Sequence, residues 1–333
     1  MPSAQLIKSF LKYPIELYAS IFGAHRKDYS EPRLWIMMYH RILPQNDYRF
    51  TTEEPGMVVE PKTFEMHIKT LQNEFTLIHL NDWIKRKKAG LPLPNKACAI
   101  TFDDGWLDNY EFAFPILEKL QAPATLFAVS NMVGSNQTFW PNRIQNILSQ
   151  PKDKMNGIDW FFEHFPDKTE AIGVDELAKL INTLKQRSDE SLMRMIEEAE
   201  KTLSIKNPEK PVIVNESQLH QMAHSDLIEI GSHTQRHIRL VRGLPEKTYF
   251  DEIVGSKKQL EEIIEKPIHL FCYPNGDFCE DSVKLVSQHY QAAVTTRKGI
   301  NNFDMNIYTL NRFGVHQDIS NNTRKFLARI SGV

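Results

Sequence analysis

Short apolar runs alternate with amphipathic stretches along most of the chain. The apolar runs have the length of buried strands, and they lie at residues 34–39, 76–80, 96–102, 124–129, 227–231, 268–273 and 292–296. Helical patterns separate them at residues 61–75, 81–90, 109–121, 246–264 and 281–289. This alternation predicts a parallel sheet with helices outside it, either a barrel or an open doubly wound sheet.

One long segment departs from this alternation. Residues of about 135–215 are rich in Lys, Glu and Asp, follow a helical pattern and contain only weak strand patterns. We interpret the segment as a helical insertion in a loop of a single barrel domain that spans residues 31–325. The chain therefore has one main folding unit rather than two.

Residues 1–30 form a separate amphipathic segment. Its apolar positions Leu6, Phe10, Leu17 and Ile21 are accompanied by Lys8, Lys12, Arg26 and Lys27, and Pro14 interrupts the pattern. Two interpretations stay open, namely a helix packed on the domain and an interfacial contact with a membrane. We read no export signal in this segment and no apolar stretch of the roughly 18 residues that a membrane span needs.

Composition excludes several classes of protein. Of the 333 residues, 41% are hydrophobic and 25% are charged, as in ordinary soluble globular chains. The formal net charge of −2 lacks the basic footprint of a general nucleic-acid binder, so no nucleic-acid partner is expected. Cys98, Cys272 and Cys279 have no framework spacing, which argues against a disulfide-stapled fold.

Two polar clusters follow predicted strands, where a parallel sheet presents its functional residues. Asp103 and Asp104 directly follow one strand, and two adjacent carboxylates there repel each other unless a divalent metal stabilises them. His233 and His237 follow another strand at positions i and i+4. On a helical turn this spacing would place both imidazoles on one face. One Asp and two His would leave coordination positions open for water and substrate.

These motifs resemble one known family. The sequence TFDDG at 101–105, HTQRH at 233–237 and FCYPNG at 271–276 resembles the polysaccharide deacetylases, also called the NodB-homology group or carbohydrate esterase family 4. The strand ending MMYHRI is similar to the branch that de-N-acetylates exopolysaccharide. The resemblance covers about residues 34–135 and 215–318, and it implies a distorted (β/α)7 TIM-like barrel.

The resemblance also implies roles for individual residues. Asp104, His233 and His237 resemble the metal ligands, and Asp103 resembles the general base. Zn²⁺ is the expected metal, with Co²⁺, Ni²⁺, Fe²⁺ and Mn²⁺ chemically allowed. A backbone N–H near Tyr273 would hold the oxyanion together with the metal.

The general acid is less clearly marked, because the sequence departs from the commonest family pattern here. His40, at the end of a buried strand, is favoured, and His316 in the segment Phe313-Gly-Val-His316 is the alternative. The arginine that often orients the base is absent from the third motif. Arg312, just before the final strand, is expected to replace it.

The resemblance implies a hydrolase of carbon–nitrogen bonds other than peptide bonds. We expect a metal-dependent deacetylase that removes the N-acetyl group of an amino sugar in bacterial surface polysaccharide biosynthesis (O-antigen, capsule or exopolysaccharide). The alternatives are an amidase or deformylase on a small N-acyl compound and a non-catalytic carbohydrate-binding relative. Without an export signal, a cytoplasmic protein is expected, either free or peripheral at the inner membrane. A lipid-linked sugar would suit the second location.

Overall fold

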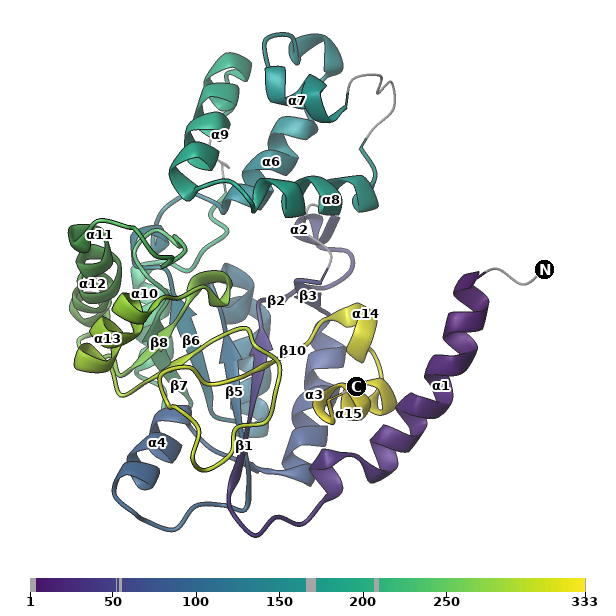
Figure 1. The fold of residues 1–333 in the computed structure, drawn as a ribbon, viewed down its shortest axis with the longest axis vertical. Coiled ribbons are helices and arrows are strands. Elements are labelled where there is room, and N and C mark those ends of the chain that lie inside the picture. The colour runs from purple at the N-terminus through teal and green to yellow at the C-terminus, as the bar shows by residue number, and fades with distance from the viewer. Residues whose placement is uncertain (1–3, 52, 54–55, 166–171, 207–209, 333) are drawn as a thin grey trace.

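The computed structural model describes the chain apart from residues 1–3, 52, 54–55, 166–171, 207–209 and 333. A parallel sheet with the strand order β10-β1-β5-β6-β7-β8-β9 curls into a half-barrel surrounded by helices (Figure 1). Its strands are β1 (Arg33–Tyr39), β5 (Lys96–Phe102), β6 (Ala124–Ala128), β7 (Ile228–Ser232), β8 (Leu270–Cys272), β9 (Ala292–Val294) and β10 (Phe313–Gly314). The parallel sheet predicted from the alternation is confirmed.

Three short strands complete the sheet structure. β4 (Thr76–Leu77) pairs with the beginning of β5, while β2 (Arg41–Ile42) and β3 (Val58–Val59) form a separate pair near the ends of β1 and β5. The helices around the half-barrel are α3 (Pro61–Glu74), α4 (Leu80–Lys88), α5 (Phe114–Leu120), α10 (Glu216–Ala223), α11 (Glu246–Phe250), α12 (Ser256–Ile264), α13 (Glu280–His289), α14 (Gln317–Ser320) and α15 (Thr323–Ile330).

Side-chain alternation along the strands builds two apolar cores. In β1, Trp35 and Met37 pack in the layer between the sheet and the helices, whereas Leu34 and Ile36 point to the inside of the curled sheet. Because side chains alternate along a strand, β5 follows the same rule. Its inward series begins with Ala97 and Ala99 and continues through Thr101 to Asp103. The period of two therefore brings one carboxylate of the Asp pair into the barrel interior.

The helix predicted at 109–121 is present with a local change of geometry. Its first turn, Asn109–Ala113, is a π-helix that runs into α5. Pro115 has no N–H to donate to the carbonyl group of Glu111, and the wider turn accommodates this missing hydrogen bond.

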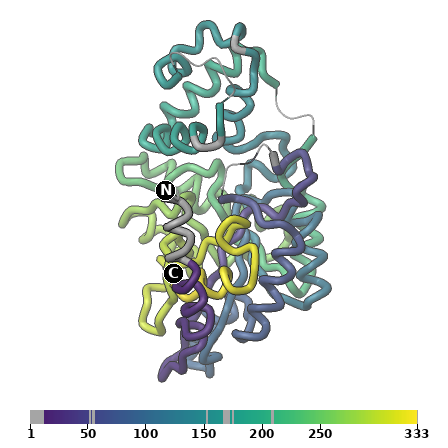
Figure 2. Tube along the Cα trace, turned by 90° about the vertical axis from the view of Figure 1, so that its right-hand side faces the viewer, coloured from purple at the N-terminus to yellow at the C-terminus, as the bar shows by residue number. Residues whose placement is uncertain are grey.

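A second helical layer stands on the sheet edge at which the strands end. It contains α6 (Trp140–Leu148), α7 (Asp159–His164), α8 (Val174–Leu184) and α9 (Asp189–Leu203), and it sits above the half-barrel in both views (Figures 1 and 2). We call these four helices the helical cap. The cap has its own apolar core, which includes Ile144, Trp160, Leu180 and Ile196.

The chain begins with α1 (Ala4–Phe22), which leans on α15 and projects away from the half-barrel (Figure 1). The helix continues through Pro14, although the sequence suggests an interruption there. Among the described residues, no helix combines the length and apolarity that crossing a membrane requires.

Candidate active site

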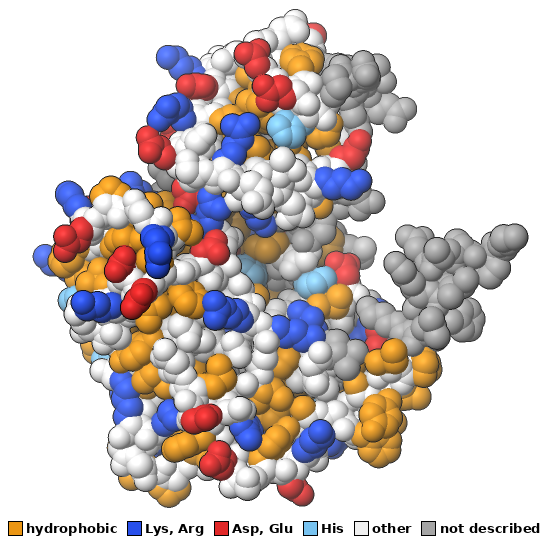
Figure 3. All heavy atoms as spheres, viewed as in Figure 1, with side chains coloured by type: hydrophobic (Ala, Val, Ile, Leu, Met, Phe, Trp, Pro, Cys, Tyr) orange, Lys and Arg blue, Asp and Glu red, His pale blue; other side chains and the backbone are white. Residues whose placement is uncertain are grey.

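The loops after six strands of the main sheet (β1, β5, β6, β7, β8 and β9) converge on one cleft beneath the helical cap. The cleft has a volume of about 210 Å³, and Figure 3 shows histidine side chains in the hollow between the cap and the half-barrel. Its lining residues are His40, Glu53, Met57, Asp103, Asp104, Trp106, Phe139, Trp140, Pro141, Asn142, Lys185, His233, His237, Asn275 and Thr296. The structure thus brings together the Asp pair, the His pair and His40.

Asp103 is held by a buried arginine. The Nη1 and Nη2 atoms of Arg312 donate to Oδ1 and Oδ2 of Asp103, each at 2.7 Å, and the arginine side chain is fully buried. Burial alone would raise the pKa of Asp103, but the guanidinium reverses the effect and holds that pKa below its usual value. Asp103 is therefore an oriented carboxylate, and Arg312 has the contact that the sequence analysis expected.

Asp104 points in a different direction because its backbone adopts a left-handed conformation with φ of 77°. Trp106 donates its indole N–H to Oδ2 of Asp104 at 2.9 Å. The other oxygen, Oδ1, lies 3.5 Å from Nε2 of His233 and 3.5 Å from Nε2 of His237. The three side chains thus converge on one point.

The chemistry of these three side chains fits a divalent metal. Their ligand atoms lie within 4.8 Å of one another, and a carboxylate with two imidazoles is a common donor set for Zn²⁺ and related ions. Nδ1 of His233 lies 2.8 Å from the carbonyl oxygen of Cys272, to which it donates, so Nε2 is the ring nitrogen that faces Asp104 and is placed for a metal. Burial and the neighbouring His233 lower the pKa of His237 to about 4, which leaves this imidazole neutral.

A second group with metal-binding geometry contains Asp103, His233 and Cys272. Arg312 already donates to both carboxylate oxygens of Asp103, and its Nη2 lies 3.2 Å from Sγ of Cys272. Burial also raises the pKa of the Cys272 thiol, which keeps it protonated. The group around Asp104 is therefore the better metal site.

The prediction that His233 and His237 lie on a helical turn is wrong. His233 and His237 lie in a loop without helical structure, in which Thr234 and His237 both have positive φ angles of 66° and 59°. Thr234 Oγ1 accepts a hydrogen bond from the N–H of His237 at 3.0 Å and closes the loop. The two imidazoles meet through this turn, with ring centroids 4.8 Å apart.

The two candidate acids occupy different places. His40 lines the cleft, and its Nε2 atom lies 3.9 Å from Oδ2 of Asp103. His316 precedes α14 and pairs with Asp318 at 3.3 Å, and it is not among the described residues that line the cleft.

The expectation that a backbone N–H near Tyr273 holds the oxyanion needs a correction, because the N–H of Tyr273 itself is already used. The N–H of Tyr273 donates to the carbonyl oxygen of Val294 at 3.2 Å, and the side chain is fully buried. The N–H of Tyr273 is therefore not available to a substrate. Asn275, two residues later and in a left-handed conformation with φ of 55°, is the residue of this turn that reaches the cleft.

Sequence reasoning missed the charged residues that support Trp106. The guanidinium of Arg41 lies 4.0 Å from the centroid of the Trp106 ring, and Asp108 and Glu53 accept hydrogen bonds from Arg41. Phe139, at the entrance to the cap, packs on Trp106 and on His237, with centroid distances of 4.9 and 5.0 Å. The only signal in the sequence was the aromatic pair at 139–140, and its partners are distant along the chain.

Comparison with known proteins gives the family. A family model described as polysaccharide deacetylase matches residues 90–294, which is more than half of the chain. The chain belongs to the polysaccharide deacetylase family. It is therefore a hydrolase of carbon–nitrogen bonds other than peptide bonds, and the family implies an N-acetylated sugar as substrate.

Two curated relatives extend this result. YxkH of Bacillus subtilis, which carries the family's name, is 25% identical over 297 residues, or 86% of this chain and 73% of its own length. The poly-β-1,6-N-acetyl-D-glucosamine N-deacetylase of Staphylococcus epidermidis is 29% identical over 166 residues. That match covers 46% of this chain and 55% of the relative.

A solved structure shares the fold. The deacetylase PplD of Streptococcus pyogenes, in complex with acetate, superposes with a TM-score of 0.60 at 17% identity. The superposition covers 90% of this chain and 99% of PplD. The expected (β/α)7-type barrel is thereby confirmed.

Proposed function

We propose that this polysaccharide deacetylase is a metal-dependent enzyme that removes the N-acetyl group of an amino sugar in bacterial surface polysaccharide biosynthesis. The observation that carries the proposal is that one cleft contains a set of three possible metal ligands and, beside it, two further groups that could act as base and acid. Asp104, His233 and His237 converge on one point, while the adjacent Asp103 and His40 lie beside that point and outside the donor set.

Asp104, His233 and His237 would hold the metal, and Zn²⁺ suits this donor set best. When bound, a divalent ion there polarises the acetamide carbonyl and makes water a stronger nucleophile at neutral pH. The indole N–H of Trp106 donates a hydrogen bond to Oδ2 of Asp104, which leaves Oδ1 to face the two imidazoles. The indole thereby selects a single ligand oxygen.

Asp103 acts as the general base. It takes the proton of the attacking water, and the two hydrogen bonds from Arg312 keep the carboxylate ionised and fixed in direction. An arginine in this place holds the base without competing for the proton, because a guanidinium stays charged.

His40 acts as the general acid. The bond between nitrogen and the acetyl carbon breaks only when the departing amine receives a proton. His40 lines the cleft with its Nε2 atom 3.9 Å from Oδ2 of Asp103, so it is placed to donate a proton to the departing amine of a substrate whose carbonyl carbon faces the base. The place of His40 in the cleft supports it over His316.

The substrate is an N-acetylated amino sugar in a surface polysaccharide or in its precursor. The match to the Staphylococcus epidermidis enzyme named for poly-β-1,6-N-acetyl-D-glucosamine supports a β-linked N-acetylglucosamine chain as the first substrate to test. A lipid-linked oligosaccharide is the second, and it would place the enzyme at the inner membrane.

Acetate release from poly-β-1,6-N-acetylglucosamine oligosaccharides tests the proposal. The wild type should release acetate. Asp103→Asn should lower the rate by about 10²–10⁴-fold, because an amide group replaces the carboxylate that acts as the base. The bound metal should stay, because no metal ligand is lost. Asp318→Asn removes an exposed carboxylate outside the cleft and should leave the rate unchanged. Full activity of Asp103→Asn, or loss of its metal, would overturn the assignment of the two Asp roles.

A further inference from the structure

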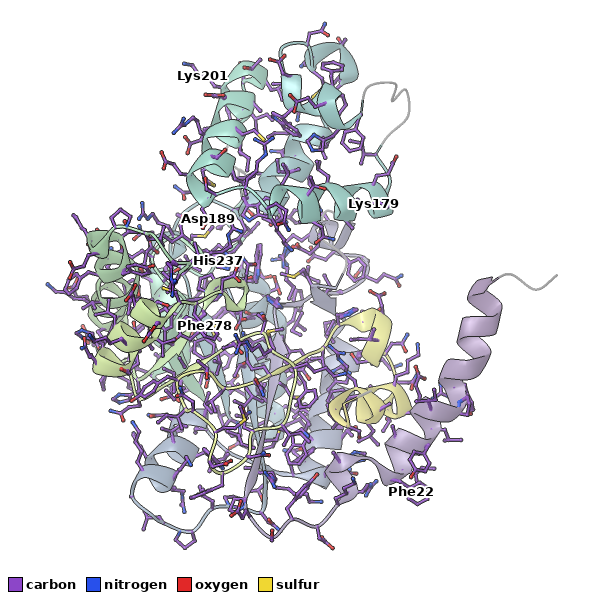
Figure 4. All side chains as sticks on the ribbon, in the orientation of Figure 1. Phe22, Lys179, Asp189, Lys201, His237 and Phe278 are labelled. Atoms are coloured by element: carbon purple, nitrogen blue, oxygen red, sulfur yellow. The ribbon has the colours of Figure 1, made fainter. Side chains whose placement is uncertain are left out.

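The distribution of apolar and polar residues around α1 is the reverse of what a helix packed on a domain normally has. Seven of its residues between positions 13 and 22 are exposed, and all seven are apolar or aromatic: Tyr13, Pro14, Ile15, Leu17, Tyr18, Ile21 and Phe22. Helices on soluble domains usually bury such a face and expose the polar one. Figure 3 shows hydrophobic side chains gathered over this part of α1, and Phe22 is labelled at its end in Figure 4.

The buried side of the helix is small and polar. Glu16, Ala19 and Ser20 face the domain, and Glu16 pairs with Arg324 of α15 at 3.5 Å. These contacts fix the rotation of α1, so its apolar side is turned away from the protein. Tyr13 still contacts Arg324, whose guanidinium carbon lies 4.0 Å from the ring centroid, but the other exposed apolar side chains contribute little to packing on the domain.

The sequence continues the same pattern toward the N-terminus. Leu6, Ile7, Phe10 and Leu11 precede the exposed positions at helical spacing. Between positions 1 and 30 the sequence has four basic residues, Lys8, Lys12, Arg26 and Lys27, and two acidic ones, Glu16 and Asp28. Glu16 is paired with Arg324, and Arg26 is paired with Glu74 at 2.9 Å. The sequence of the segment thus has an amphipathic pattern and an excess of positive charge.

We propose that α1 lies on the surface of a lipid bilayer with its apolar face inserted at the boundary between headgroups and acyl chains. Exposed aliphatic residues would enter the acyl region, Tyr13 and Tyr18 suit the headgroup level, and the lysines would attract anionic lipids. Helices that lie in a membrane interface have this combination of an apolar face and cationic flanks. The proposal is independent of the deacetylase mechanism.

The width of the apolar face favours lipid over a second copy of the chain. At about 100° per residue, the exposed positions from Tyr13 to Phe22 cover about 200° of the helix circumference. A helix pair buries only a narrow seam of two positions per heptad. A bilayer surface can cover the broad face, whereas one partner helix would leave much of it in water.

Co-sedimentation of the full-length protein with vesicles tests this inference. One set of vesicles contains phosphatidylcholine alone, and the other contains equal parts of phosphatidylcholine and phosphatidylglycerol. The test variant combines Tyr18→Gln, Ile21→Gln and Phe22→Gln. The matched control combines Leu91→Gln, Phe250→Gln and Phe303→Gln, which are exposed apolar residues elsewhere on the molecule.

The wild type and the control should sediment with vesicles, more strongly with the anionic set, and the α1 variant should lose at least about tenfold in partitioning. Acetate release from a soluble oligosaccharide should be equal in all three proteins, which separates this test from that of the deacetylase mechanism. Wild-type protein that stays in the supernatant with both vesicles would overturn the proposal, as would equal binding by the α1 variant. A wild-type dimer that the α1 variant dissociates without vesicles would assign the face to a second copy.

Discussion

Adjacent residues of one type acquire different chemistry from their surroundings in this cleft. Asp103 continues the inward-facing series of β5 and meets Arg312, while the left-handed backbone at Asp104 turns the second carboxylate toward two imidazoles. The first carboxylate is neutralised by a permanent cation, and the second is left for a metal. One local change in backbone direction thus separates the proposed base from the proposed metal ligand.

Removal of the acid at position 40 is the most informative single substitution after those of the Asp pair. His40→Ala should lower the rate of acetate release by about 10²–10⁴-fold, because the leaving amine loses its proton donor. Bound metal should be unchanged, since His40 is outside the donor set. Steady-state rates and elemental analysis on the same samples measure both quantities, with His316→Ala as the control. The reverse pattern in the two variants would make His316 the acid.

Several of these residues could be identified from sequence and others could not. Asp103, Asp104, His233 and His237 lie in two short motifs directly after predicted strands, so their convergence follows from a parallel sheet. Arg41, Glu53 and Phe139 support Trp106 and His237 through contacts between segments far apart in sequence. No periodicity encodes such contacts. The expectation for Tyr273 reached the correct turn, but the sheet hydrogen bond that occupies its N–H depends on β9.

Among the structural elements, the helical cap is tied to the loop that carries His233 and His237. Arg239, two residues after His237, donates from its backbone N–H and Nε to Asp189 at 2.8 Å each and from Nη1 to the carbonyl oxygen of Lys185 at 2.6 Å. Figure 4 shows Asp189 at the base of α9 above His237. Since Lys185 lines the cleft, this contact holds one wall of the substrate site in place.

Breaking this contact should weaken substrate binding rather than the chemistry. Arg239→Ala is expected to raise KM by roughly tenfold, equivalent to about 1.4 kcal/mol, because the wall at Lys185 loses its anchor. Metal content should not change. Arg194→Ala removes an exposed pair with Glu190 on α9 and serves as the control. An unchanged KM for Arg239→Ala would mean that the cap does not contact substrate.

Sequence patterns located the elements better than their arrangement. The runs at 34–39 and 96–102 became β1 and β5 almost to the residue, because strands buried on both faces are nearly continuous in hydrophobicity. The insertion at about 135–215 was recognised as helical. Its position over the cleft was not predictable, because it depends on the Arg239–Asp189 contact and the packing of Phe139, which join distant segments.

At the scale of the whole molecule, a buried carboxyl group lies at the opposite edge of the sheet. Glu229 of β7 lines a cavity of about 290 Å³ with Asn81, Lys85 and His269, among others. Burial raises the pKa of Glu229 from 4.5 to about 7, although Asn81 and Lys85 lower it in part and Asp82 adds to the rise. The folded state therefore keeps a proton that the unfolded state has already released.

This proton links stability to pH. Between about pH 4.5 and 7, Glu229 binds more protons in the native state than in the unfolded state. The contribution of Glu229 to the free energy of unfolding therefore falls as pH rises. Relative to Glu229→Gln, the free energy of unfolding of the wild type should fall by at most about 3 kcal/mol across that pH range. Urea unfolding of both proteins at several pH values measures the difference, with exposed Glu262→Gln as the control. A difference that is constant with pH would contradict the raised pKa.

The central claim is that Asp104, His233 and His237 hold the metal on which deacetylation depends. Its most direct measurement is elemental analysis of purified wild type and His233→Ala, with His79→Ala as a control outside the cleft, paired with acetate release from the same samples. The account predicts about one metal per chain in the wild type and the control, and loss of both metal and activity in His233→Ala. A wild type that releases acetate without any metal, or a His233→Ala variant that keeps both, would contradict it.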